Sequence, residues 1–173
     1  DNGNARVQVF RKANDQTPLR ILNVTKNERP EAIAVRQNIV AVATSAHRLR
    51  LYRLTGTGYT EFASAKVGNG VRGVALGPDN VVYVSRHHGL RGHSLKKYQY
   101  DNNELRNVTV ISDSFMTLWP DIYPEAVPMV TGPDGNIWYT TGRTLGAVLA
   151  LDPASDDVKE VMQGLDRPTS LDF

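Results

Sequence analysis

Two stretches of the sequence share a Gly-Pro-Asp turn followed by a strand-forming run, and this repetition limits the folds open to the chain. Residues 132–140 read Gly-Pro-Asp-Gly-Asn-Ile-Trp-Tyr-Thr, and residues 77–84 read Gly-Pro-Asp-Asn-Val-Val-Tyr-Val. Proline presets the turn, the Asp-Gly pair of the later stretch accepts left-handed geometry, and the β-branched and aromatic residues favour a strand. This self-similarity indicates a repeat protein.

The spacing of the apolar strands gives the length of the repeat. Ile33 and Val74 lie 41 residues apart, and so do Val130 and Leu171. The two Gly-Pro-Asp turns lie 55 residues apart, which is 41 plus an insertion of 14. Each repeat holds four short strands, and no helical periodicity of useful length intervenes. A repeat of about 40 residues with four strands is typical of a propeller blade.

Counted outward from the axis as strands A to D, the predicted elements read CD, ABCD, ABCD, ABCD and A, or 15 strands. We therefore expect an all-β fold, a β-propeller built from four-stranded blades of about 41 residues, and a fragment of a five- to seven-bladed ring. The alternative is a small, imperfect four-bladed ring. The chain, 1–173, is then a single partial propeller domain. Its predicted parts are the end of one blade at 1–29, a blade at 30–70, a blade at 71–125 with an insertion at 112–125, a blade at 126–166, and the start of the next blade at 167–173.

Charge and composition exclude several classes of function. The chain carries 20 Lys and Arg residues against 18 Asp and Glu residues, and the two signs are interspersed, which gives no case for nucleic-acid binding. Arg48, Arg50 and Arg53 alternate with leucines, and this pattern predicts one solvated face of a strand. No apolar run approaches the roughly 20 residues that span a bilayer, so we expect no membrane span.

The sequence contains no cysteine, which excludes disulfides and thiolate chemistry. It starts at Asp1 rather than at methionine, so we expect that an upstream piece has been removed or left out. The absence of cysteine does not fix the compartment, and we predict a secreted protein with an extracellular or periplasmic location.

Three motifs resemble those of a known superfamily. Residues 4–10, Asn-Ala-Arg-Val-Gln-Val-Phe, resemble the end of an NHL repeat. Residues 132–140 and 146–153 resemble the blade motif of streptogramin lyase-like propellers (the virginiamycin B lyase-like group). The resemblance extends over almost the whole chain and implies an NHL / streptogramin lyase-like β-propeller.

This superfamily includes streptogramin lyase, sugar-lactone hydrolases, quinone-dependent sugar dehydrogenases and many NHL interaction modules. In the lyase, metal-binding and catalytic groups are His and Glu residues, often just after a Trp-Phe-Thr strand. Here the residue after the corresponding Trp-Tyr-Thr strand is Thr141, at a place where lyase-like blades commonly carry Glu. The departure argues against lyase chemistry.

In propeller geometry, the D-to-A and B-to-C connections meet at one mouth of the central channel, and the candidate catalytic residues fall there. His87, His88 and His93 form the densest histidine cluster of the sequence. Imidazole is both a ligand for divalent metals and a general base near neutral pH. We therefore take these three residues as candidate ligands of a divalent metal, and His87, His88 and Glu125 as catalytic candidates. The alternative is an exposed loop that carries histidines by chance.

Four arginines at the same mouth favour an anionic ligand, because a guanidinium pairs with carboxylate or phosphate in a fork. They are Arg72, Arg86, Arg143 and Arg167. The alternative is that Arg143 and Arg167 pair with nearby acidic residues. Glu31 and Glu125 precede equivalent A strands and could form a carboxylate pair, or could serve only in structural ion pairs.

The insertion at 112–125 is the least repeat-like part of the chain and is rich in large apolar residues. Long loops in compact folds are usually functional or disordered, and this composition argues against disorder. Trp119 and Tyr123 could dock a partner or cover the channel mouth. The alternative is that the insertion packs on its own blade.

The sequence therefore predicts a non-enzymatic β-propeller module that binds through its loop face as an interaction or scaffold protein. We expect a protein partner or a complementary chain, and allow for a small anionic ligand. The alternative is a propeller enzyme of the streptogramin lyase, sugar lactonase or quinone-dependent sugar dehydrogenase type. No cofactor is identified beyond the candidate divalent metal.

Overall fold

The computed structural model describes residues 5–10, 17–25, 27–56, 58–87, 93–102, 104–111, 128–140, 146–166, 168 and 170–173. Within these residues the chain forms strands and turns and no helix. The strands are β1 (Arg6–Val9), β2 (Arg20–Asn23), β3 (Pro30–Arg36), β4 (Ile39–Thr44), β5 (Arg48–Thr55), β6 (Gly58–Lys66), β7 (Val71–Leu76), β8 (Val81–His87), β9 (His93–Asp101), β10 (Glu104–Ile111), β11 (Met129–Thr131), β12 (Ile137–Thr140), β13 (Gly146–Leu151) and β14 (Val158–Leu165).

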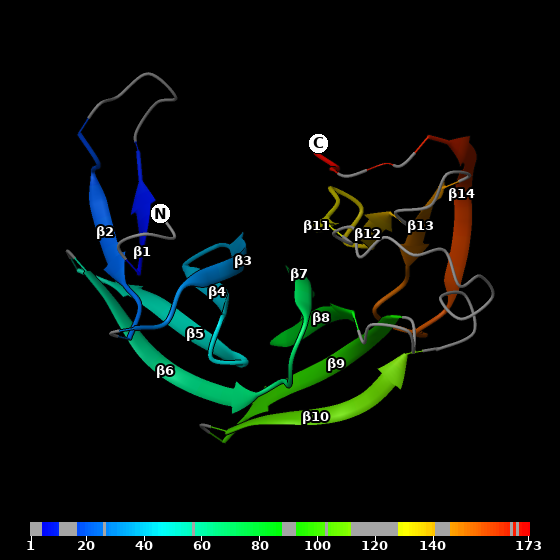
Figure 1. Ribbon diagram of the computed structural model, residues 1–173. Helices are drawn as coiled ribbons and strands as arrows, with labels where there is room; N and C mark the ends of the chain where they lie inside the picture. The colour runs from blue at the N-terminus through cyan, green and yellow to red at the C-terminus, as the bar shows by residue number, and fades with distance from the viewer. Residues whose placement is uncertain are drawn as a thin grey trace.

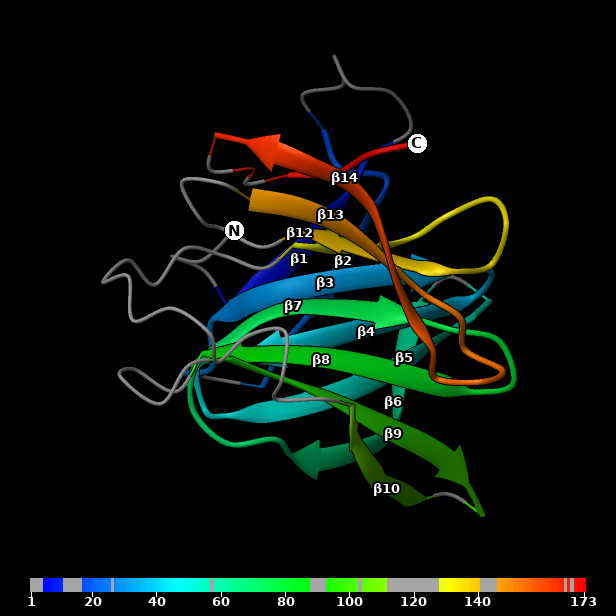
Figure 2. The same cartoon turned by 90° about the vertical axis from the view of Figure 1, so that its right-hand side faces the viewer.

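These strands form one two-stranded sheet and three four-stranded sheets, each an antiparallel meander in chain order. We call the sheets blade I (β1–β2), blade II (β3–β6), blade III (β7–β10) and blade IV (β11–β14). Figure 1 shows them side by side in an arc, with β3, β7 and β11 innermost and β6, β10 and β14 outermost. In the view turned by 90°, the inner strands β3 and β7 run next to each other across the molecule (Figure 2). This is the arrangement of propeller blades, and it confirms the predicted fold class.

The middle strands β4 of blade II and β13 of blade IV are apolar on both faces. Strand β4 is buried at every position after its first residue, as expected from its sequence Ile-Val-Ala-Val-Ala-Thr. Strand β13, with the sequence Gly-Ala-Val-Leu-Ala-Leu, is buried along its whole length. A strand that faces water on one side alternates apolar and polar residues, so these continuous runs mark strands that are covered on both sides.

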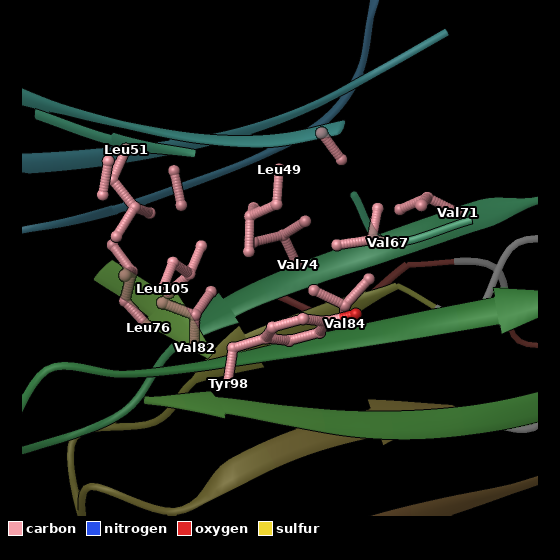
Figure 3. Packing of buried hydrophobic residues seen from close by; sticks show 13 residues of the cluster. Leu49, Leu51, Val67, Val71, Val74, Leu76, Val82, Val84, Tyr98 and Leu105 are labelled. Carbon is pink, nitrogen blue, oxygen red and sulfur yellow. The ribbon is translucent and has the colours of Figure 1, made fainter. Parts of the chain in front are cut away.

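The largest hydrophobic cluster lies between blades II and III. Leu49 and Leu51 of β5 face Val74 of β7, Val84 of β8 and Tyr98 of β9 (Figure 3). All five side chains are almost fully buried. At about 1.5–3 kcal/mol for each fully buried Val or Leu side chain, this interface stabilises both sheets substantially.

Two further clusters join the remaining blades. Blades III and IV meet through Tyr83 and Leu95 on one side and Ile137, Tyr139 and Leu149 on the other. Blade I packs its buried residues onto strands β4 and β5 of blade II, through Leu22, Val24, Val40, Val42 and Tyr52. Blade I leaves the adjacent side of β3 uncovered, where Ile33 and Val35 are exposed.

The repeated Gly-Pro-Asp turn has a packing reason as well as a conformational one. In each hairpin an aromatic residue six positions after the glycine lies against the glycine itself. A Cβ on Gly77 would lie 2.9 Å from the Tyr83 ring, and one on Gly132 would lie 2.6 Å from Trp138 Nε1. The predicted left-handed geometry is also present, since Gly135 has φ +85°. The glycine, the turn and the aromatic residue therefore form one structural unit.

The carbonyl oxygen of Leu76 links the inner strands of three blades. It accepts a hydrogen bond from Arg36 Nη1 at 3.3 Å, across from blade II, and from Thr131 Oγ1 at 2.7 Å, across from blade IV. A second link joins blades III and IV, where Lys97 Nζ lies 2.7 Å from Asp156 Oδ1. Directional contacts of this kind fix the orientation of adjacent blades more precisely than apolar packing alone does.

The sequence predicted one strand more than the described residues form. Residues 168 and 170–173, expected to begin another A strand, have no strand geometry. They lie against blade IV, where Thr140 Oγ1 donates to the Pro168 carbonyl at 2.9 Å and Phe173 makes an edge contact with Trp138. A strand needs a neighbour for its backbone hydrogen bonds, and the described residues supply none here. The 112–125 insertion lies outside the described residues, and the predicted division of the domain stays a prediction.

The glycine–aromatic packing predicts a specific sensitivity. Gly77→Ala should destabilise the chain by about 1–3 kcal/mol, because its methyl group would overlap the fully buried Tyr83 ring. Gly58→Ala is the matched control: nothing lies within 4 Å of its added Cβ, and a change within about 0.5 kcal/mol is expected. Urea unfolding of both variants measures the difference. Equal stability of the two would show that the turn tolerates a side chain.

Candidate functional site

The candidate site lies at the end of the blades where the D-to-A and B-to-C connections occur, which we call the loop face. Because every sheet is an antiparallel meander, these connections share one end and the A-to-B and C-to-D turns share the other. In blades II and III the described residues of the loop face include 27–29, 45–47 and 67–70.

The structure places some of the predicted site residues and leaves others untested. Arg72 is exposed on β7, Arg86 is buried near the end of β8, and Glu31 is exposed on β3. His87 and His93 occupy paired positions at the ends of β8 and β9, but their side chains are not among those described. The remaining candidates lie outside the described residues: His88, Trp119, Tyr123, Glu125, Arg143 and Arg167.

The metal prediction is not tested by the part of the chain that the structure describes. Within those residues, no three His, Cys, Asp or Glu side chains come together to hold a metal ion. The three histidines proposed as ligands all have side chains outside that set. Nor does any helix long and apolar enough to cross a membrane occur among the described residues.

Blade II contains a buried charged network that the sequence did not reveal. Arg50 donates from Nε and Nη2 to the two oxygens of Glu28, at 2.8 and 2.6 Å. Its Nη1 donates to both oxygens of Glu61, at 2.9 and 2.8 Å. Thr44 Oγ1 also donates to Glu28, at 2.9 Å. The arginine thus binds two carboxylates at once through its planar fork.

The prediction that Arg48, Arg50 and Arg53 share a solvated strand face is wrong for Arg50. Only 9 % of Arg50 is exposed, and Glu28 is equally buried. The reason is that β5 lies in the interior of the stack, so a polar residue on either of its faces is covered by a neighbouring sheet. Arg53 does remain exposed, with its guanidinium 4.5 Å from the centre of the Phe62 ring.

The network shifts the pKa values of its members in the directions that its contacts require. Hydrogen bonding to Arg50 holds the pKa of Glu28 below its ordinary value, against the opposing effect of burial. Hydrogen bonding to Glu28 in turn raises the pKa of Arg50. Burial, with the nearby Glu61 charge, raises the pKa of the Tyr52 hydroxyl to about 12. Glu28 and Arg50 are therefore each kept in the ionised form by the other.

Blade III repeats the same backbone framework one period later. Asn27, just before Glu28, has φ +69°, and Gly68, 41 positions on, has φ +80°. Asn69 therefore occupies the position of Glu28. The side chain of Asn69 is exposed, and its backbone carbonyl faces blade III instead of a carboxylate.

The strand positions that surround this loop also correspond, by register. Val42 pairs with Arg50 in blade II, and Val84 pairs with Lys96 in blade III. The position of Thr44, two residues beyond Val42, is occupied in blade III by Arg86. Blade III therefore has two cations where blade II has an arginine and a threonine.

The second carboxylate of blade II is also missing from blade III. Tyr52 pairs with Glu61 across β5 and β6, and Tyr98 pairs with Asn107 across β9 and β10. The tyrosine is kept while the acid becomes an amide. Both acidic positions of the blade II network are thus uncharged in blade III.

Arg86 is fixed beneath the loop face by contacts with uncharged groups. Its Nε and Nη2 both donate to the Asn69 carbonyl at 3.1 Å, and only 9 % of the residue is exposed. The guanidinium lies against Gly68, where a Cβ would come within 2.4 Å of Nη2. Lys96 is half-buried nearby, and burial, with the positive charge of Arg86, lowers its pKa. Among the described residues, no carboxylate pairs with either cation.

Of the four arginines predicted to bind an anion, the structure describes Arg86, which is buried, and Arg72, which is exposed, and their role stays a prediction. Lys96 was missed. The repeat contained a signal for it. Glu28 and Asn69 are 41 residues apart, so aligning the blades shows that the carboxylate of blade II is replaced by an amide in blade III, which leaves the cations nearby, Lys96 among them, without that acid.

No protein family model matches the sequence, and no curated protein matches it. Solved structures do resemble the chain, and the three named below share less than 25% identity with it, which shows the fold alone. One is a functionally unknown protein from Desulfotomaculum acetoxidans DSM 771, at a TM-score of 0.63 and 14% identity over 97% of this chain and 51% of that one.

Two others are β-propellers. A chain of the mitotic checkpoint complex aligns at a TM-score of 0.55 and 13% identity over 95% of this chain and 46% of that one. A putative oxidoreductase (glucose dehydrogenase) from Thermus thermophilus aligns at 0.52 and 20% identity over 73% of this chain and 44% of that one. The chain thus spans about half the length of the structures that it resembles.

The blade II network predicts an acid-dependent loss of stability. The pKa of Glu28 is lower in the folded chain than its ordinary value of 4.5. Its stabilising effect is therefore fully present above that value and lost as the pH falls through the folded-state pKa. Glu28→Gln should cost about 3 kcal/mol near neutral pH and should cost progressively less as the pH falls below about 4.5.

The matched control is Glu104→Gln, because Glu104 pairs with Arg106 at an exposed site on β10. An exposed pair of this kind contributes about 0–1 kcal/mol, so the control should stay close to wild type. Denaturant unfolding at several pH values measures both variants. A Glu28→Gln cost that is no larger than that of the control, or that does not change with pH, would contradict the account.

Proposed function

We propose that the chain is a non-enzymatic β-propeller module that binds an acidic protein partner through its loop face. The observation that carries the proposal is the pair Arg86 and Lys96, two partly or fully buried cations that face no described carboxylate. Burying a charge is costly unless a partner compensates it. A binding partner that brings negative charge to this place would supply the compensation.

The exposed residues around this pair have the same sign. Arg29, Lys66 and Arg72 are exposed at the loop end of blades II and III. Glu31 is the exposed acid close to them in the chain, and Glu28 is neutralised by Arg50. A surface of one sign attracts an oppositely charged partner and raises its rate of association, more strongly at low salt.

We also propose that the chain belongs to the NHL / streptogramin lyase-like superfamily, and we keep a propeller enzyme as the alternative function. The motifs at 4–10, 132–140 and 146–153 support an NHL / streptogramin lyase-like propeller, whose members include interaction modules. The enzyme alternative depends on His87, His88, His93 and Glu125, whose side chains lie outside the described residues. It stays a prediction, and the positions of Arg86 and Lys96 favour binding.

A charge reversal on the loop face tests the binding role. Lys66→Glu combined with Arg72→Glu changes two exposed residues and should leave the fold intact. Immobilised protein is exposed to an extract of its native source, and the retained proteins are quantified by mass spectrometry. The proteins that wild type retains should be reduced at least about tenfold by this variant, because two favourable charges become repulsive.

Lys159→Glu is the control, because Lys159 is exposed on β14 near the opposite end of the strands. It should retain the same proteins as wild type. If the double reversal on the loop face retains an unchanged set of proteins, or if Lys159→Glu loses as much as the double reversal does, the loop face is not the binding surface.

A further inference from the structure

Blade II shows what its framework does with a carboxylate. The Glu28 side chain enters from the D-to-A loop and is bound by the Arg50 fork and by Thr44 Oγ1, with bonds of 2.6–2.9 Å. The site is closed, since both Glu28 and Arg50 are about nine-tenths buried. It can therefore serve as a template for the same place in the next blade.

Blade III lacks the acids of this template and adds a cation. The formal charges of Glu28, Glu61, Arg48 and Arg50 in blade II sum to 0. The equivalent positions of blade III hold Asn69, Asn107, Ser94 and Lys96, and Arg86 replaces Thr44, with a sum of +2. Two neighbouring blades with one backbone framework thus differ by two charges at one place.

The local backbone prepares the arginine for a ligand. Gly68, which stands where blade II has Asn27, leaves space for the guanidinium to lie against the chain. The Asn69 carbonyl holds two of the guanidinium nitrogens, so the group is already oriented before a ligand arrives. An oriented arginine loses little freedom on binding, which favours affinity.

From this correspondence we infer that blade III contains a binding site for one carboxylate group, held by Arg86 and Lys96 and supplied by a Glu or Asp side chain of the partner. The partner's carboxylate lies between Arg86 and Lys96, beside the Asn69 carbonyl that stands at the position of Glu28 and already accepts from Arg86 Nε and Nη2. The inference rests on the proposed function and deepens it, because it names the chemical group at the centre of the loop-face interaction.

A carboxylate is favoured over phosphate by the template itself. In blade II the group held at the equivalent place is the Glu28 carboxylate, bound by Arg50 and by Thr44. Blade III has Lys96 at the position of Arg50 and Arg86 at the position of Thr44, so a carboxylate of the partner would meet a cation at each of these two positions.

The test uses the full chain and three probes: a blocked tetraglutamate peptide, its tetraglutamine counterpart and inorganic phosphate. Binding is followed by NMR through the Arg86 Nε–H signal and by calorimetry. The tetraglutamate peptide should shift the Arg86 signal, while tetraglutamine should not and phosphate should bind at least about tenfold more weakly. An unmoved Arg86 signal, or phosphate binding as tight as that of the peptide, overturns the carboxylate assignment.

Two variants locate the site without removing the buried arginine. Lys96→Gln should weaken peptide binding at least about tenfold, because it removes one of the two cations that hold the carboxylate. Asn69→Glu should abolish binding and raise the melting temperature, because it restores the acid of blade II from within the chain. Lys159→Gln, on β14, should bind the peptide as wild type does. Unchanged affinity in both site variants overturns the inference.

These outcomes separate the inference from the proposed function. If the peptide fails to bind but the loop-face reversal still loses the retained proteins, the chain is an interaction module that uses other contacts. If both experiments fail, the loop face has no binding role.

Discussion

Blades II and III each have two apolar faces, and each face packs on the sheet beside it. This packing fixes the arc of blades, because Leu49 and Leu51 of blade II have no other way to leave water than to pack on Val74 and Val84 of blade III. The same packing governs the charged residues. A side chain on a middle strand faces a neighbouring blade rather than solvent, so a charge placed there must find a partner.

Blades II and III answer that constraint in opposite ways. In blade II, Arg50 is compensated by Glu28 and Glu61, and the network is complete within the chain. In blade III, Lys96 lies at the position of Arg50 and Arg86 at that of Thr44, the Asn69 carbonyl accepts from Arg86, and asparagines stand at the positions of Glu28 and Glu61. One framework thus carries a closed charged network in blade II and an excess of positive charge in blade III, through exchange of two acids for two asparagines and of Thr44 for Arg86.

Local pattern in the sequence was enough to predict the strands, because turn residues and strand-forming runs act over a few positions. The Gly-Pro-Asp motif located two hairpins, and the 41-residue spacing indicated blades. The charged network was not predictable from alternation, because Arg50 and Glu28 are 22 residues apart and meet only in the folded sheet. Arg86 was predicted to bind an anion because of its place beside a loop. The position of Lys96 near Arg86 could be found only from the register of β8 with β9. The candidates on 88–92, 112–127 and 141–145 lie outside the described residues.

Blade II neutralises its own buried arginine with carboxylates of the chain, whereas the positive charges of Arg86 and Lys96 in blade III have no such partner among the described residues. The titration of the Lys96 ammonium group tests this difference most directly. Burial and the neighbouring Arg86 lower the pKa of Lys96 from its ordinary value of 10.5. NMR titration of the labelled lysine side chains should find Lys96 below that value in the wild-type chain and higher in the Asn69→Glu variant. A wild-type Lys96 that titrates at or above 10.5 would mean that its charge is already compensated, and would contradict the account.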